Sequence, residues 1–140
     1  MTTVKTRAAE ALTPMLSAFH SIDDRPLKAV WKIYTDGSLD KLVLDFGTVS
    51  LIVVADGNDD SIEITAADTP DVCNTDGVDG SDLEPWNSFI GRPFGWGWIT
   101  INQQGYCDGL LLSFGGIVPQ LVLNVIASSI KVSAIKGGEV

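Results

Sequence analysis

From Leu27 almost to its end, the chain alternates apolar and polar residues in short runs that are separated by turn residues. This pattern is typical of β-strands joined by tight connections. Asp36-Gly37 and Asp56-Gly57 favour hairpins, because glycine adopts positive φ and aspartate tolerates it. The unbroken apolar run at 51–54 predicts a central strand that is buried on both faces. The predicted strands are 27–34, 39–46, 48–55, 61–66, 96–102, 106–114, 120–126 and 129–135, the last two forming one long bent strand or two separate ones.

Residues 5–21 carry a different pattern, an apolar stripe at spacings of three and four that is typical of an amphipathic helix. The stripe consists of Ala8, Leu12, Met15 and Phe19. Thr13-Pro14 predicts a restart of this helix, with proline at a first helical position. A short second helix is predicted to begin at Trp86. Together with the strands, this predicts an α+β fold in which an N-terminal helix packs on a curved, mainly antiparallel sheet of six to seven strands.

The length of 140 residues corresponds to one domain with a core of its own. We therefore expect a single α+β domain over residues 1–140. Within it, residues 67–85 lose all periodicity and are expected to form an acidic loop. Residues 136–140 are expected to be a frayed tail.

Acidic residues are concentrated in one part of the chain. Between Leu42 and Gly91 there are eleven carboxylates and no Lys, Arg or His, whereas the remaining 90 residues hold 9 basic and 7 acidic groups. The formal net charge of −9 comes from this block. It argues against binding to nucleic acid or to a membrane surface, since both need clustered Lys and Arg, and it favours a basic protein partner. The acidic surface candidates are Asp71, Asp76, Asp79, Asp82 and Glu84.

The acidic loop also resembles a calcium loop, because hard oxygen ligands and a glycine at a sharp turn are what such a site needs. The spacing in residues 71–82 does not fit, however, because Asp71 lies one residue too far from Asn74 and the last aspartate comes one residue early. A second candidate, 56–61, has serine where glycine is needed and Ala67 in place of the closing glutamate. We therefore expect a solvated acidic loop and no bound metal or other cofactor.

The predicted hairpin at 96–108 is the main candidate for a binding site. Trp96 and Trp98 are expected on one face of a strand, and Gly97 leaves the opposite face bare for a close approach. The turn that follows presents amide, phenol and carboxylate groups that could recognise a ligand or partner by hydrogen bonds. Alternatively, the tryptophans fill the core and the amides satisfy the turn. The candidate residues are Trp96, Trp98, Asn102, Gln103, Gln104, Tyr106 and Asp108.

Catalytic groups are sparse, so we do not expect an enzyme. His20 is the single histidine, and a Cys107–His20–Asp108 arrangement conflicts with the opposite directions of adjacent strand residues. Phosphate-binding and nucleophile-elbow glycine motifs are absent from the sequence. With two cysteines, no long apolar run and no signal-peptide pattern, we expect a cytoplasmic protein with free thiols.

The second half of the chain carries a family resemblance. The residues that carry it are Trp96-x-Trp98, Asn102-Gln103-Gln104-Gly105-Tyr106-x-Asp108-x-Leu110, Phe114 and Ala127-Ser128-Ser129-Ile130-Lys131. They resemble a family of small uncharacterised bacterial proteins, a domain of unknown function. The similarity covers roughly residues 27–66 and 88–135 and leaves the acidic loop as an insertion. No activity is established for that family, so the resemblance implies no catalytic residues.

These features lead us to expect a non-enzymatic protein-interaction module. Its size and acidity are similar to those of many toxin-immunity proteins, so the expected form is an acidic inhibitor or immunity-like protein. Its carboxylates would steer and pair with a basic partner. The alternative is a small-ligand or calcium-binding domain, in which the hairpin lines a pocket or the loop holds the ion. Long antiparallel strands with apolar faces also allow a homodimer.

Overall fold

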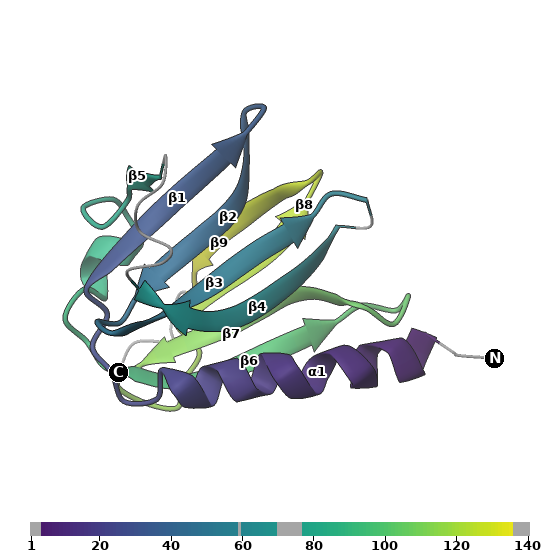
Figure 1. The fold of residues 1–140 in the computed structure, drawn as a ribbon, viewed down its shortest axis with the longest axis horizontal. Helices are drawn as coiled ribbons and strands as arrows, with labels where there is room; N and C mark the ends of the chain where they lie inside the picture. The colour runs from purple at the N-terminus through teal and green to yellow at the C-terminus, as the bar shows by residue number, and fades with distance from the viewer. Residues whose placement is uncertain (1–3, 59, 70–76, 136–140) are drawn as a thin grey trace.

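The computed structural model describes the backbone of residues 4–58, 60–69 and 77–135, and the side chains of this part from Leu12 onward. These residues form one α-helix, one short 3-10 helix and nine strands (Figure 1). In chain order the elements are α1 (Val4–Ser21), β1 (Ala29–Thr35), β2 (Ser38–Asp45), β3 (Val49–Asp56), β4 (Ser61–Asp68), β5 (Val78–Asp79), η1 (Trp86–Ser88), β6 (Phe94–Ile101), β7 (Cys107–Phe114), β8 (Leu121–Ile126) and β9 (Ser129–Ala134).

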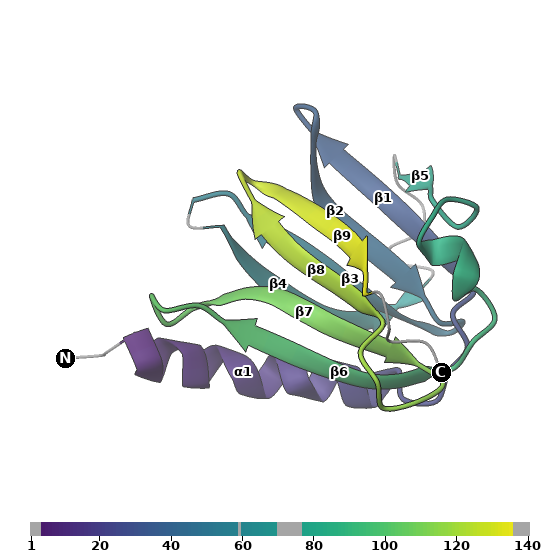
Figure 2. The same cartoon turned by 180° about the vertical axis from the view of Figure 1, so that it is seen from behind.

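The strands form two antiparallel sheets that face each other. The first sheet has the order β4-β3-β2-β1-β5, and the second has the order β6-β7-β8-β9. Strand β2 contacts β9 across the interior, and β4 contacts β7 and β8. Figures 1 and 2 show these two layers from opposite sides. Within the described residues no strand pairing joins the two sheets, so they do not close into a barrel.

The core fills the space between the inner faces of the two sheets. Its fully buried aliphatic side chains include Leu42, Leu44, Leu51 and Ile64 from the first sheet, and Leu110, Leu112, Leu121 and Leu123 from the second. At one end the ring of Phe94 lies edge-on to Phe46 and Phe114, with centroid distances of 6.0 and 5.9 Å. Aromatic pairs favour this geometry. The alternation read from the sequence thus identifies residues that pack together across two layers.

Helix α1 covers the gap between the edge strands β4 and β6, and it contacts both of them (Figures 1 and 2). The buried side chains Met15 and Phe19 belong to the predicted apolar stripe. Phe19 stacks on Phe94 with a centroid distance of 5.7 Å. The helix therefore fastens one sheet to the other. Within the described residues, no helix combines the length and apolar character that a membrane crossing requires.

The prediction of a helix packed on mainly antiparallel strands is confirmed, but the prediction of one sheet with six to seven strands is wrong. The described residues form nine strands in two sheets. The link between the sheets is non-local: the amide of Leu27 donates to the carbonyl of Arg92, and the amide of Phe94 donates to the carbonyl of Arg25. Alternation shows that a strand has two faces, and it does not show which distant segment lies against them.

Several local predictions also change. Pro14 lies inside one continuous helix and does not restart it. The short helix at Trp86 is confirmed as η1. The region 120–135 is two strands joined by a turn in which Ala127 and Ser128 have positive φ.

The acidic loop is shorter than predicted. Strand β4 extends to Asp68, and the short strand β5 pairs with β1 through the partners Trp31 and Asp79. Backbone pairing thus orders parts of 67–85 that show no periodicity in the sequence. Residues 70–76 and the predicted frayed tail at 136–140 lie outside the described residues.

Strand β3 is buried on both faces over residues 51–53, whereas Val54, the last residue of the apolar run that predicts a buried strand, is 37% exposed. Leu51 and Val53 face the core and are fully buried, whereas Ile52 is only 9% exposed on the opposite face. On that outer face, the buried Ser50 hydroxyl shares a 2.7 Å hydrogen bond with the Thr69 hydroxyl. The outer side of the first sheet is therefore covered at Ser50 and Ile52 and exposed at Val54.

Candidate functional site

The two tryptophans of β6 lie together on the outer face of the second sheet. Their ring centroids are 6.4 Å apart and the rings are stacked. Trp96 is 55% exposed and Trp98 is half-buried. Gly97 points the other way, where an added Cβ would lie 2.5 Å from the Phe19 ring. The predicted division of faces is confirmed, and the alternative in which the tryptophans fill the core is wrong.

Apolar side chains continue from this pair across the sheet. Trp98 pairs with Leu111, and Leu111 pairs with Val122 on the next strand. Both aliphatic residues are half-buried. We call Trp96, Trp98, Leu111 and Val122 the tryptophan face. Figure 2 looks toward the second sheet and shows no other helix or sheet in front of it. An exposed aromatic pair extended by aliphatic neighbours is typical of an interaction surface.

A groove runs beside the tryptophan face, between the second half of α1 and the start of β6. One hollow in it has a volume of about 420 Å³, and an adjoining hollow has about 400 Å³. The two share Asp23, Phe94, Gly95 and Trp96. We call this pair of hollows the α1–β6 groove. Its lining residues are Leu16, Phe19, His20, Asp23, Asp24, Pro93, Phe94, Gly95, Trp96, Gly97, Gly115, Gly116 and Ile117.

The polar turn of the hairpin does not join this site. Trp96 lies near the beginning of β6, and the turn follows Ile101, so the two are separated by about 20 Å of extended strand. Asn102 is used within the turn, because its Oδ1 accepts a 2.9 Å hydrogen bond from the amide of Gln104. Gln103 and Gln104 are exposed. The expectation that tryptophans and amides line one pocket is therefore wrong.

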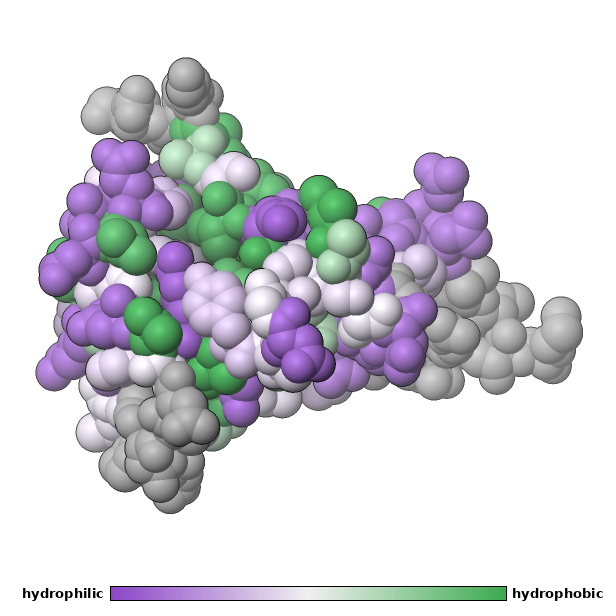
Figure 3. Space-filling model, turned by 90° about the horizontal axis from the view of Figure 1, so that it is seen from above, coloured by the Kyte–Doolittle hydropathy of each residue, from purple (hydrophilic) through white to green (hydrophobic). Residues whose placement is uncertain are grey.

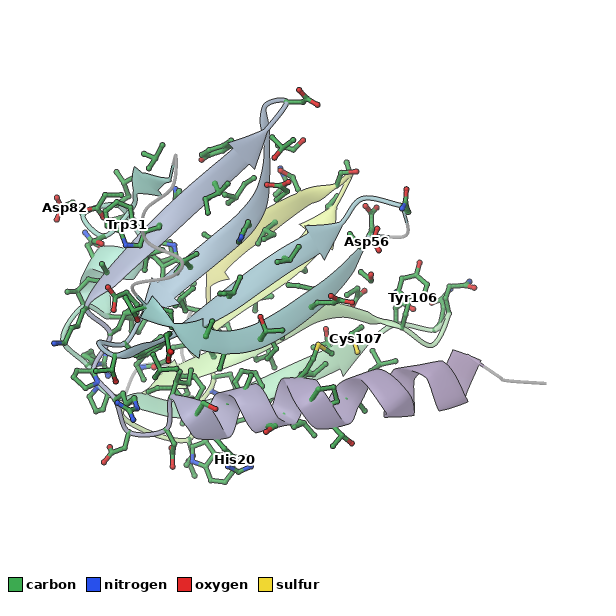
Figure 4. The ribbon with its side chains drawn as sticks, in the orientation of Figure 1. His20, Trp31, Asp56, Asp82, Tyr106 and Cys107 are labelled. Atoms are coloured by element: carbon green, nitrogen blue, oxygen red, sulfur yellow. The ribbon has the colours of Figure 1, made fainter. Side chains whose placement is uncertain are left out.

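The remaining hairpin candidates also lie away from the groove. Tyr106 is half-buried next to the turn, and Figure 4 places it at the opposite end of the molecule from His20. Asp108 accepts a 3.1 Å hydrogen bond from the hydroxyl of Thr100. This contact ties β6 to β7. The turn residues, Tyr106 and Asp108 therefore do not belong to the tryptophan face.

Among the described residues, the sulfur of Cys107 and the imidazole of His20 are not arranged for nucleophilic chemistry. Cys107 is 4% exposed and has no disulfide partner. Figure 4 shows it well separated from His20, toward the other end of α1. Burial raises the pKa of the Cys107 thiol, and the negative charge of Asp108 raises it further. Since the thiolate is the reactive form, this cysteine is a buried apolar group and not a nucleophile.

Three carboxylates of the acidic block stabilise their own turns. Asp45, Asp56 and Asp79 each accept a hydrogen bond from the amide two residues later, at 2.7–2.9 Å. Hydrogen bonds from the side chain and then the backbone of Ser81 lower the pKa of Asp79. These are Asx turns, for which short acidic side chains are suited. Asp79, Asp82 and Glu84 are exposed, whereas Asp71 and Asp76 lie outside the described residues.

A further hollow of about 270 Å³ lies where the turns of three hairpins meet. One of its walls is Asp40, whose Oδ1 is buried without a hydrogen-bond partner in the described structure. The nearby carboxylate of Asp60 accepts a 2.9 Å hydrogen bond from the amide of Ser128.

No group of three or more His, Cys, Asp or Glu side chains within the described residues could hold a metal ion. Seen from above in Figure 3, the surface mixes hydrophilic and apolar residues without one continuous apolar area.

Sequence reasoning missed the groove residues Leu16, Asp23 and Asp24. One signal was present: Leu16 is an apolar residue beside the helical stripe, at a position that an amphipathic helix turns toward solvent. It is 44% exposed. The acidic pair directly after the helix gives no comparable signal, because such residues are common where helices end in turns.

Comparison with known proteins gives a family but no activity. Residues 13–139 match a family that is described as a family of unknown function, DUF6334. This agrees with the resemblance to a domain of unknown function, and the matched span includes the acidic region. No curated protein and no solved structure has significant similarity to the chain. Because the match extends over nearly the whole sequence, the chain is a member of the DUF6334 family.

Proposed function

We propose that this chain is a non-enzymatic protein-interaction module that binds a basic partner through the tryptophan face. The observation that carries the proposal is the stacked pair of Trp96 and Trp98, exposed on the outer side of a sheet. Tryptophan is enriched among the residues that contribute most to binding energy at protein interfaces. Burial of Trp96 by a partner would remove a large apolar surface from water.

The charge of the chain supports a basic partner. The formal net charge is −9, and within the described residues no carboxylate forms an ion pair with a Lys or Arg of the same chain. Unpaired carboxylates steer a positively charged protein toward the surface and suppress binding of acidic ones. An inhibitor or immunity-like role fits this combination of an exposed aromatic pair and a negative net charge.

The proposal is tested by affinity capture from a lysate of the organism's own cells. We expect the wild-type chain to retain a specific protein and the Trp96→Ala/Trp98→Ala variant to lose it. A Tyr34→Ala variant is the control, because Tyr34 is an aromatic residue of similar exposure, 50%, on the first sheet. Thermal unfolding of each variant confirms that it is folded. If the double variant retains the same proteins as the wild type, the tryptophan face is not the binding surface.

A further inference from the structure

We propose that the α1–β6 groove receives a short segment of the partner in which an apolar side chain stands next to lysine or arginine. This inference rests on the proposed function and adds where the partner is held and by which chemistry. The groove shares Trp96 with the tryptophan face, so that one partner segment can contact both.

The apolar part of the site is already formed. Leu16 from α1 and Trp96 from β6 line it, and both are about half exposed. The rings of Phe19 and Phe94 line it as well. Gly97 has no side chain to fill the space on the strand side. A volume of about 420 Å³ lies within the range of roughly 300–1,000 Å³ that is usual for binding pockets. An aliphatic side chain of a partner fits such a hollow.

The charged part of the site lies where α1 ends. Asp23 and Asp24 line the groove, and neither carboxylate has a hydrogen bond or ion pair with another described residue. The negative end of the helix dipole adds to their attraction for a cation. The neighbouring Arg25 forms no ion pair with either of them. Its Nε donates to the carbonyl of Ser21 and its guanidinium donates to the hydroxyl of Thr48.

The carboxylates of Asp23 and Asp24 also distinguish between two possible occupants of the groove, a basic segment and a second copy of this chain. Among the residues that the structure describes, no Lys or Arg lines either hollow of the groove. A second copy of this chain would bring a net charge of −9 toward these carboxylates, and like charges oppose such contact. A basic segment gains two ion pairs at the rim of an apolar hollow. Charge complementarity therefore favours a basic partner over a homodimer at this surface.

The test uses a fluorescein-labelled heptapeptide that alternates lysine with leucine, and fluorescence anisotropy measures its affinity. The groove variant is Leu16→Ala/Asp23→Asn/Asp24→Asn, in which asparagine tolerates the positive φ of residue 24. The matched control is Leu83→Ala/Asp82→Asn/Glu84→Gln, at a second exposed leucine between two carboxylates. Both variants lose one leucine side chain and two negative charges, and both keep the tryptophans.

We expect the groove variant to bind the peptide about tenfold more weakly, because it loses exposed ion pairs that each contribute modestly. We expect the affinity of the control variant for the peptide to change by less than about twofold. Replacing the leucines of the peptide by serine should weaken binding to the wild type about fivefold or more. Equal weakening by both variants, or no binding of the peptide to the wild type, overturns the groove assignment. In that case a partner whose capture still depends on Trp96 and Trp98 would leave the proposed function standing.

Discussion

Among single residues, Gly95 decides the direction in which the tryptophans point. Phe94 pairs with Phe114, but Trp96 pairs with Ser113, so β6 contains one extra residue at Gly95. Because side chains alternate along a strand, this bulge turns Trp96 to the face opposite Phe94. Phe94 is accordingly 3% exposed and packed in the core. The exposed aromatic surface thus depends on a one-residue irregularity.

Substitution Gly95→Ala tests this bulge. An added Cβ would lie too close to the backbone carbonyl of Gly116. We expect the free energy of unfolding to fall by about 1–3 kcal/mol, as for other overpacked sites. The control is Gly116→Ala, because a Cβ there meets nothing within 4 Å, and we expect a change within about 0.5 kcal/mol. Urea unfolding followed by tryptophan fluorescence measures both. Equal stability of the two variants would contradict the close approach of Gly95 to the backbone of Gly116.

Among the elements, α1 has the largest influence on the site, because it closes one side of the molecule and forms one wall of the groove. Strands β4 and β6 are edge strands, and the helix packs along both. The edges are thereby shielded from pairing with other chains. The helix contains Pro14 in its interior and remains continuous, although proline lacks an amide for the helical hydrogen bond. Tertiary packing of the apolar stripe holds the helix together across this position.

Substitution Pro14→Ala should stabilise the protein. Alanine restores the helical hydrogen bond at this exposed position, and we expect a gain of about 1–3 kcal/mol in the free energy of unfolding. Ser17→Ala, also at an exposed position of α1, is the control and should gain only a few tenths of a kcal/mol, about the difference in helix propensity. Far-UV circular dichroism during urea unfolding measures both. A loss of stability in Pro14→Ala would show that proline is needed to end or bend the helix.

In the molecule as a whole, the formal net charge is −9, and the carboxylates of Asp23 and Asp24 line the groove beside the tryptophan face. The acidic residues of the described part form no ion pairs with other described residues, and several serve turns at strand ends. Their electrostatic field therefore remains available for attraction over several ångströms to a basic partner. In the proposed complex, the apolar contacts at Trp96 and Leu16 would form only after the partner has arrived. Charge should thus govern the rate of association. The apolar contacts in the groove should govern the lifetime of the complex.

The salt dependence of peptide binding tests this division. We expect the association rate constant of the lysine–leucine heptapeptide to fall severalfold or more between about 0.05 and 0.5 M salt, because added ions shorten the screening length. The dissociation rate constant should change less. Stopped-flow anisotropy measures both. An association rate that does not vary with salt would contradict electrostatic steering.

Most elements of the fold were predictable because their signals are local. The spacing of Met15 and Phe19 indicates a helix face, and Asp36-Gly37 indicates a hairpin turn, irrespective of what packs against them. The position of Trp96 and Trp98 on the same face of one strand followed from strand periodicity alone. The division of the strands into two sheets was not predictable, because it depends on contacts between residues that are far apart in the chain.

The sequence alone determined the helix, most of the strands, the acidic character and the common face of the two tryptophans. The tertiary structure decided that this face is exposed, because the bulge at Gly95 turns Trp96 to the side of the sheet opposite Phe94. It also brought Leu16, Asp23 and Trp96 together in one groove, although they lie on different elements. Alternation specifies that a strand has two different faces, but only the packing of distant elements decides which face is covered and which is left exposed to solvent.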